Sequence, residues 1–129
     1  MKNVAAALAM VNGTVMLTRR APNQQLEGYW EFPGGKVEPG ETVQQCIERE
    51  IKEELNLACV ADRVFMESVY EYEGGAINLI GVLVTVSGEP ELLVHDRLTW
   101  VPLDDLLTFK LAPADIPIAK ELLRAHGPN

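Results

Sequence analysis

The stretch of sequence that most constrains this chain runs from Gly34 to Leu57 and reads GGKVEPGETVQQCIEREIKEELNL. Residues three and four apart lie side by side on a helix, so Glu50, Glu53 and Glu54 are expected to share one strip of its surface. Like charges at that spacing repel each other. The strip therefore needs either exposure to water or a cation among its carboxylates.

The apolar face of the same predicted helix borders this strip. At about 100° per residue, the apolar positions fall within an arc of roughly 120°. Those positions are Val43, Ile47, Ile51 and Leu55. Glu54 falls inside the arc, and Glu50 and Glu53 fall at its edge. A solvated acidic face is the alternative, but Lys52 is predicted on the far side of the helix, where it cannot neutralise the strip.

Carboxylates that face partly inward resist desolvation unless a cation lies among them. Hard oxygen ligands without His or Cys suit Mg²⁺, or Mn²⁺ as an alternative. The ends of the helix are also predicted, because Thr42 and Gln45 form a capping box and Asn56 tolerates the left-handed conformation that ends many helices. The helix is therefore expected from Val43 to Leu55.

The rest of the chain is predicted to be mainly strands. Asn12-Gly13 between two apolar runs is a strong hairpin signal, with the first strand at 1–11. Further strands are expected at 57–60, 64–72, 76–86 and 98–101, and a last helix at 116–125. Because helices follow groups of strands, this order predicts a mixed sheet with helices packed on its faces, not a doubly wound parallel sheet.

The spacing Gly35, five residues, Glu41, seven residues and then REIKEELNL from Arg49 resembles the Nudix box, G-x5-E-x7-R-E-U-x-E-E-x-G-U, where U is a bulky aliphatic residue. Every fixed position matches except the last glycine, where this chain has Asn56, which also tolerates left-handed backbone. The resemblance implies one α+β domain over residues 1–129. Its Nudix fold would hold a mixed β-sheet sandwiched between helices (α/β/α).

The resemblance also implies a set of metal-binding and catalytic residues. Glu50 and Glu54 would be metal ligands, together with the carbonyl oxygen of Gly34. Glu53 would be a ligand or the base that activates water, and Arg49 would orient a neighbouring glutamate. Glu53, Glu50 and Arg49 are therefore the predicted catalytic residues, and the choice of base stays open because it differs among Nudix enzymes.

Two residues outside this set follow from the same resemblance. Glu41, just before the helix, is expected to be structural and to pair with helix amides. MutT-like relatives often supply one more metal-binding glutamate six residues before the tryptophan of the following strand, and that position is Val94 in this chain. The candidates to replace the missing ligand are Glu91, His95 and Asp96.

The segment LAPADIP, residues 111–117, resembles the CTP pyrophosphohydrolase branch of the MutT group, in which MutT itself has Asn in place of Asp115. A carboxylate here could accept a hydrogen bond from an exocyclic amine such as cytosine N4, or could recognise an oxidised purine when protonated. Asp115 immediately before Ile116-Pro117 is also a good helix N-cap. Base recognition and capping stay open as alternatives.

Two further residues are predicted to bind substrate. Arg19 and Arg20 are adjacent in an expected strand, so their side chains point to opposite faces. By resemblance to MutT-like enzymes, Arg20 would lie near the nucleotide phosphates, whereas a solvated surface pair is the alternative. The backbone of Phe32 is the candidate to contact the base.

The charge of the chain limits its partners. Eleven basic and nineteen acidic residues give a net charge of −8, which argues against a surface for polymeric nucleic acid. No stretch approaches the ~20 apolar residues of a membrane span, and the N-terminal residues lack a signal-peptide pattern. Cys46 and Cys59 lack metal-like or disulfide-framework spacing and are expected to be reduced and buried. A cytoplasmic location without membrane contact, and a monomer in preference to a homodimer, are predicted.

The resemblance implies an Mg²⁺-dependent nucleoside triphosphate pyrophosphohydrolase that cleaves (d)NTPs to a nucleoside monophosphate and pyrophosphate. Cytosine-type or oxidised nucleotides are the expected small-molecule substrates, which suggests a role in nucleotide-pool sanitation. One alternative is a Nudix hydrolase of ADP-ribose or a dinucleoside polyphosphate. A non-catalytic nucleotide-binding module is a second alternative, but such modules usually lose glutamates of the box, and this chain keeps them.

Overall fold

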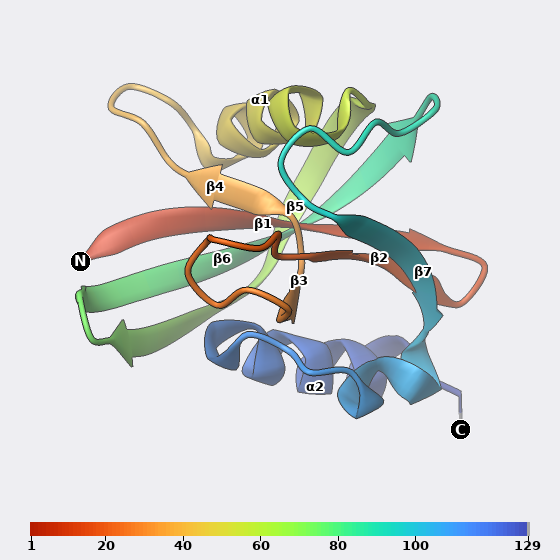
Figure 1. Ribbon diagram of the computed structural model, residues 1–129. Helices are drawn as coiled ribbons and strands as arrows, with labels where there is room; N and C mark the ends of the chain where they lie inside the picture. The colour runs from red at the N-terminus through yellow and green to blue at the C-terminus, as the bar shows by residue number, and fades with distance from the viewer. Residues whose placement is uncertain (129) are drawn as a thin grey trace.

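The first strand, β1 (Lys2–Val11), lies at the centre of the sheet in the computed structural model, which describes residues 1–128 (Figure 1). It pairs in parallel with β6 (Gly75–Ser87). On its other edge it pairs antiparallel with β4 (Gly34–Lys36) and with β2 (Thr14–Arg19). Because β4 and β2 share this edge, the strand that carries the two glycines lies beside the first half of β1.

The remaining strands extend the sheet on both sides. β3 (Trp30–Glu31) and β7 (Arg97–Pro102) both pair with β2, and β5 (Ala58–Tyr72) pairs antiparallel with β6 at the other edge. One parallel pair among antiparallel pairs makes this the predicted mixed sheet.

The backbone tests two predictions about the strands and the turns between them. The hairpin at Asn12-Gly13 is confirmed, with positive φ at both residues. The prediction of separate strands at 57–60 and 64–72 is wrong, because β5 is one strand whose pairing with β6 shifts register between Ala61 and Met66. Such irregularities let a strand continue past unpaired residues, and Glu48 Oε2 accepts the Ala61 N–H there at 2.8 Å.

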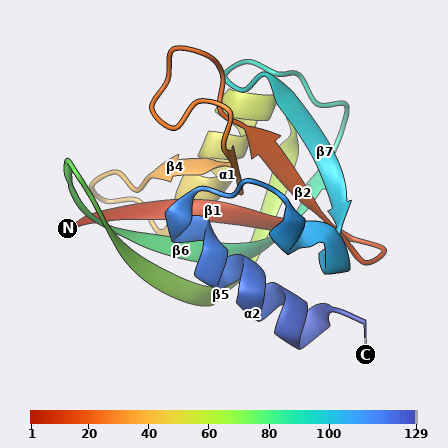
Figure 2. The ribbon, with the colours of Figure 1, turned by 60° about the horizontal axis from the view of Figure 1, so that its bottom comes forward.

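The two helices cover opposite faces of the sheet. Figures 1 and 2 show α1 (Val43–Leu55) on one face and α2 (Ile116–His126) on the other, which confirms the predicted α+β arrangement. Two short 3₁₀ helices, η1 (Leu103–Thr108) and η2 (Pro113–Asp115), precede α2. Among residues 1–128, no helix has the length and apolar character needed to cross a membrane.

Small residues in β1 allow both helices to pack closely. Ala5, Ala7 and Ala9 belong to the core on the α1 side, whereas Ala6 and Leu8 belong to the core on the α2 side, as the alternation of a strand requires. The apolar arc of α1 is confirmed, since three of its four predicted positions are fully buried. These are Ile47, Ile51 and Leu55. Each buried side chain of this size contributes about 1.5–3 kcal/mol.

Both cysteines are free thiols. Cys46, a residue of α1, is buried as expected, and burial raises the pKa of its thiol to about 12. Cys59 in β5 is only half-buried, which differs from the expectation of a buried thiol. Burial still raises the pKa of Cys59 to about 11.

Both ends of α1 form as predicted. Thr42 accepts the Gln45 N–H, and the Gln45 side chain accepts the Thr42 N–H, which completes the capping box. Asn56 ends the helix in the left-handed conformation, with φ 52° and ψ 35°. Its side chain accepts from Lys52 Nζ at 2.8 Å and donates to Glu91 Oε1 at 2.9 Å.

Replacing Asn56 by Ala should lower the free energy of unfolding by about 1–2 kcal/mol, because a Cβ without polar atoms is strained in left-handed backbone. Asn56→Gly removes the same side-chain bonds but relieves the backbone strain, so it should destabilise less. Urea unfolding of both variants measures the difference. Equal destabilisation by Ala and Gly would show that the loss in unfolding free energy comes from the side-chain hydrogen bonds and not from backbone strain.

Candidate active site

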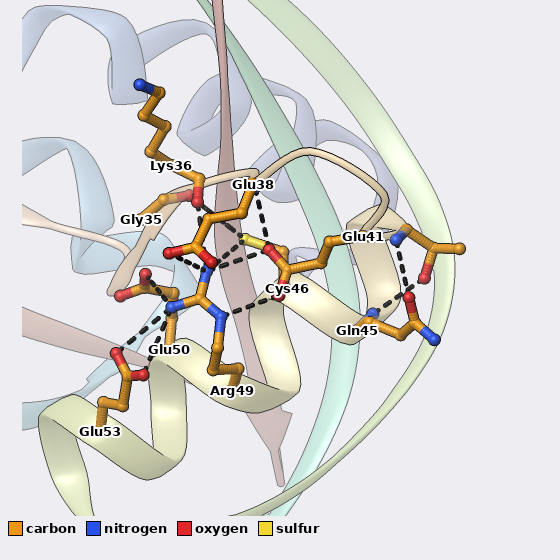
Figure 3. Close-up of polar contacts among 10 residues, drawn as sticks. Gly35, Lys36, Glu38, Glu41, Gln45, Cys46, Arg49, Glu50 and Glu53 are labelled. Atoms are coloured by element: carbon orange, nitrogen blue, oxygen red, sulfur yellow. Dashed lines mark hydrogen bonds and ion pairs between the residues drawn. The ribbon is translucent and has the colours of Figure 1, made fainter.

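Arg49 joins the acidic residues of α1 and of the turn before it (Figure 3). Its Nε donates to Glu41 Oε2 at 2.8 Å, and its Nη1 donates to Glu50 Oε1 at 2.8 Å and to Glu53 Oε2 at 3.2 Å. Its Nη2 also lies 3.8 Å from Glu38. Arg49 thus contacts the glutamates that it is predicted to orient, and its charge neutralises part of the acidic strip.

The expectation that Glu41 pairs with helix amides is wrong. Its carboxylate accepts from Arg49 and from the backbone N–H of Glu38, the latter at 3.0 Å. The Arg49 guanidinium, followed by this backbone bond, lowers the pKa of Glu41 to about 2. The reason lies in the capping box: Thr42 already serves the N-terminal end of the helix, so the Glu41 carboxylate is free to face Arg49.

The two glycines of β4 have separate structural roles. A Cβ on Gly34 would lie 1.9 Å from the carbonyl oxygen of Ala5, so glycine permits the close approach of β4 to β1. A Cβ on Gly35 would lie 2.4 Å from the carboxyl carbon of Glu50. Gly35 therefore makes the space in which the Glu50 carboxylate lies. That carboxylate is largely shielded, with 15% of its side chain exposed.

Glu54 carries the most strongly perturbed carboxylate of α1. Burial raises its pKa to about 8, and the negative charges of Glu50 and Glu31 add to the rise, whereas the Gly34 backbone opposes it. Its Oε1 atom is buried and has no hydrogen-bond partner within residues 1–128. A buried, unpartnered carboxylate oxygen beside a second carboxylate is the environment that a cation would relieve.

This environment fits a hard divalent cation such as Mg²⁺. Glu50 and Glu54 offer carboxylate oxygens, and Gly34 offers a backbone carbonyl, which are the donor types that Mg²⁺ prefers. In the described part of the chain, no three His, Cys, Asp or Glu side chains are already arranged around one metal position. Arg49 instead occupies oxygens of Glu50 and Glu53.

Glu31 in β3 is a site residue that the sequence analysis missed. Its Oε2 atom lies 2.9 Å from His95 Nε2 and 3.4 Å from Arg20 Nη1. Burial is the main cause of the raised pKa of both Glu54 and Asp115, and the negative charge of Glu31 adds to both shifts. A carboxylate between Trp30 and Phe32, three positions before the first of the two glycines, is the sequence signal that could have identified it.

The three candidates for the extra metal ligand have different surroundings. The carboxylate of Glu91 accepts from Asn56, and that of Asp96 accepts two bonds from Arg19, at 2.8 and 2.9 Å. His95 is buried against Glu31, and its Nδ1 atom has no partner in the described chain. Of the three, only His95 therefore reaches the carboxylates of the site, and it does so through Glu31.

A cavity of about 700 Å³ connects the glycines to the predicted substrate-binding residues. Its walls include Arg20, Glu31, Phe32, Gly34, Gly35 and Asp115. Arg20 is fixed in this wall because its Nε donates to the carbonyl of Gln25 at 2.9 Å. The three predicted substrate-binding residues thus line one cavity, together with the two glycines of β4.

Asp115 is buried in the wall of the cavity, beside the backbone of Phe32. Its Oδ2 accepts the backbone N–H of Phe32 at 2.9 Å, and burial, followed by the charge of Glu31, raises the pKa of its carboxyl well above the ordinary range. The alternative that Asp115 caps α2 is wrong, since its side chain makes no capping bond and its own backbone is helical. The Phe32 N–H is consequently occupied and cannot donate to a ligand.

Alanine substitutions at the two glycines of β4 should have different effects, one on the stability of the fold and the other on metal binding. Gly34→Ala would place a Cβ against the Ala5 backbone, so it should lower the thermal midpoint sharply. Gly35→Ala would meet only the Glu50 side chain, which can move, so the protein should remain folded but lose the Mg²⁺-dependent rise in thermal midpoint. Thermal unfolding with and without Mg²⁺ measures both effects. An unchanged Mg²⁺ response in folded Gly35→Ala would contradict the prediction that Glu50 is a metal ligand.

Comparison with known proteins agrees with this geometry. The NUDIX domain family model matches residues 1–122. The chain is 34% identical to the CTP pyrophosphohydrolase of Escherichia coli K12, over 99% of this chain and 97% of that protein. It is 32% identical to the 8-oxo-dGTP diphosphatase of the same strain, over 96% of this chain and 99% of that protein.

Solved structures give the same result for the fold. The solution structure of the E. coli ORF135 protein matches with a TM-score of 0.86 at 34% identity, over 99% of this chain and 94% of that one. The crystal structure of the MutT protein from Methanosarcina mazei matches with a TM-score of 0.85 at 25% identity, over 99% and 96%. The box at residues 35–57, the mixed sheet between two helices and these matches together show that the chain belongs to the Nudix family of hydrolases.

Proposed function

We propose that this Nudix protein is an Mg²⁺-dependent pyrophosphohydrolase that cleaves (d)NTPs to a nucleoside monophosphate and pyrophosphate. The observation that carries the proposal is the buried Oε1 atom of Glu54, which has no partner within residues 1–128 and lies near Glu50, next to a cavity lined by Gly34, Gly35 and Asp115. The relatives that act on CTP and on 8-oxo-dGTP support a triphosphate substrate. Cytosine-type or oxidised bases, and nucleotide-pool sanitation, follow as the proposed substrate class and role.

The acidic end of the site is proposed to hold the metal. Glu50, Glu54 and the carbonyl of Gly34 would be ligands for Mg²⁺, or for Mn²⁺ in its place. A bound divalent cation neutralises charge on the phosphate oxygens and lowers the pKa of water. Glu53 is the most exposed of the three glutamates, with 58% of its side chain accessible, so water or a cation can reach its carboxylate beside Arg49. It is proposed as a ligand or as the base for the attacking water.

Arg49 is proposed to act through the glutamates that it contacts. Its bonds to Glu50 and Glu53 hold two carboxylates in one orientation before a cation is present. A bidentate guanidinium bond to Glu41 fixes Arg49 itself. This arrangement lowers the reorganisation that metal and water binding would otherwise require.

The cavity lined by Arg20, Phe32 and Asp115 is proposed to bind the nucleotide. Arg20 pairs with Glu31 at 3.4 Å, a long contact that leaves its guanidinium able to bind phosphate oxygens. Asp115 is proposed to bind the base, either as an ionised acceptor for an exocyclic amine or as a protonated group that recognises an oxidised purine. Phe32 contributes a cavity wall and the N–H that orients Asp115.

Two alternatives are less well supported. A non-catalytic nucleotide-binding module does not need the complete set of Arg49, Glu50, Glu53 and Glu54, which is present here. Hydrolysis of ADP-ribose or of a dinucleoside polyphosphate is not favoured by the two relatives described above, whose names refer to CTP and 8-oxo-dGTP. The single domain over 1–129, the cytoplasmic location, the monomer and the absence of nucleic-acid and membrane partners stay predictions.

The test is a panel of canonical, oxidised and methylated (d)NTPs, with ADP-ribose and a dinucleoside polyphosphate added. Pyrophosphate release from a triphosphate should require Mg²⁺ and should be fastest on cytosine or oxidised substrates. Failure to release pyrophosphate from any triphosphate would overturn the proposal. Faster cleavage of ADP-ribose than of every triphosphate would instead favour the alternative hydrolase.

Two variants test the metal-dependent cleavage and the recognition of the base separately. Glu54→Gln removes a proposed metal ligand with little change in shape, so it should reduce kcat on every substrate by about 10²-fold or more. Asp115→Asn should change the order of base preference more than the maximal rate. Unchanged activity in Glu54→Gln would contradict the metal assignment, and an equal loss on all bases in Asp115→Asn would contradict base recognition.

A further inference from the structure

Tyr72, the last residue of β5, lies in the cavity wall next to the proposed base-binding residue. Its phenol oxygen accepts the backbone N–H of Ala114 at 3.2 Å. Ala114 immediately precedes Asp115 in η2, so this bond brings the phenol oxygen to the Asp115 end of the cavity. Burial raises the pKa of Tyr72, and the nearby charge of Asp115 adds to the rise.

The O–H group of Tyr72 donates no hydrogen bond within residues 1–128. A phenol oxygen can accept hydrogen bonds and has a single O–H donor. The Ala114 N–H takes an acceptor position, whereas no atom of residues 1–128 accepts the Tyr72 O–H proton. The proton is therefore available to an acceptor on a molecule in the cavity.

The ring of Tyr72 is held in place on two sides. It packs against the core cluster on the α2 side of the sheet. Its centroid also lies 4.7 Å from that of Tyr70, two residues earlier on the same face of β5. A donor whose ring is fixed in this way loses little freedom when it binds a ligand, so it can contribute to selectivity.

Tyr72 and Asp115 together present a donor beside an acceptor. The Phe32 N–H bonds to Oδ2 of Asp115 and leaves Oδ1 for a ligand. An amine that donates to this carboxylate favours its ionised form. Cytosine carries the matching pattern, with the N4 amine as donor next to N3 as acceptor, whereas uracil reverses both groups.

We propose that Tyr72 is a specificity-determining residue that donates a hydrogen bond to N3 of a cytosine base whose N4 amine is bound by Asp115. The inference rests on the proposed function, since it takes the base to lie at Asp115. It names 4-aminopyrimidine nucleotides as the preferred class. Tyr72 does not belong to the residues that perform the cleavage.

The test measures binding of CMP and of 3-deazacytidine monophosphate, in which a CH group replaces N3. Calorimetry with these monophosphates requires no turnover. Tyr72→Phe should weaken CMP binding by about threefold to tenfold, the range of one neutral hydrogen bond, and should leave 3-deazacytidine monophosphate binding unchanged. Tyr70→Phe is the matched control, because it removes a phenol oxygen from the same strand face, and it should change neither.

Several results would overturn the inference. One is equal weakening of both ligands in Tyr72→Phe with a lowered thermal midpoint, which would show that Tyr72 only supports the Ala114 backbone. Unchanged CMP binding in this variant, no measurable CMP binding, or wild-type binding of UMP as tight as that of CMP would also overturn it. Selective CMP binding without pyrophosphate release from any triphosphate would refute the proposed function alone, so the two failures are distinguishable.

Discussion

The buried carboxylate of Glu54 is the constraint on which the site depends. Burial and the neighbouring charges of Glu50 and Glu31 raise its pKa from an ordinary 4.5 to about 8. Because the folded state holds this proton more tightly than the unfolded chain, its contribution to stability is complete below about pH 4.5 and is lost as the pH rises through about 8. A cation at this carboxylate would offset the free-energy cost of ionising it in a buried position. Metal binding is therefore linked to the stability of the fold.

The rest of the site is arranged around this group. Gly35 makes room for Glu50, and Arg49 holds Glu50 in an orientation set by Glu41. The negative charge of Glu31 raises the pKa of both Glu54 and Asp115, so it couples these two carboxyl groups. Changes at the acidic end are therefore expected to affect the carboxyl group that is proposed to bind the base.

Features that depend on neighbouring residues could be predicted from the sequence. The limits of α1, its capping box and the left-handed Asn56 all follow from local backbone chemistry and side-chain type. The bonds from Phe32 to Asp115 and from His95 to Glu31 could not be predicted, because they join residues 83 and 64 positions apart. The N-cap alternative for Asp115 was wrong for the same reason, since a distant N–H takes its carboxylate.

The most direct test of this account is the titration of the Glu54 carboxyl carbon by NMR, assigned by the loss of its signal in Glu54→Gln. Without metal, this carboxyl group should titrate with a pKa near 8. Saturating Mg²⁺ should lower that pKa, because a nearby cation favours the ionised carboxylate. A metal-free pKa near 4.5, or a raised pKa that does not change with Mg²⁺, would contradict it.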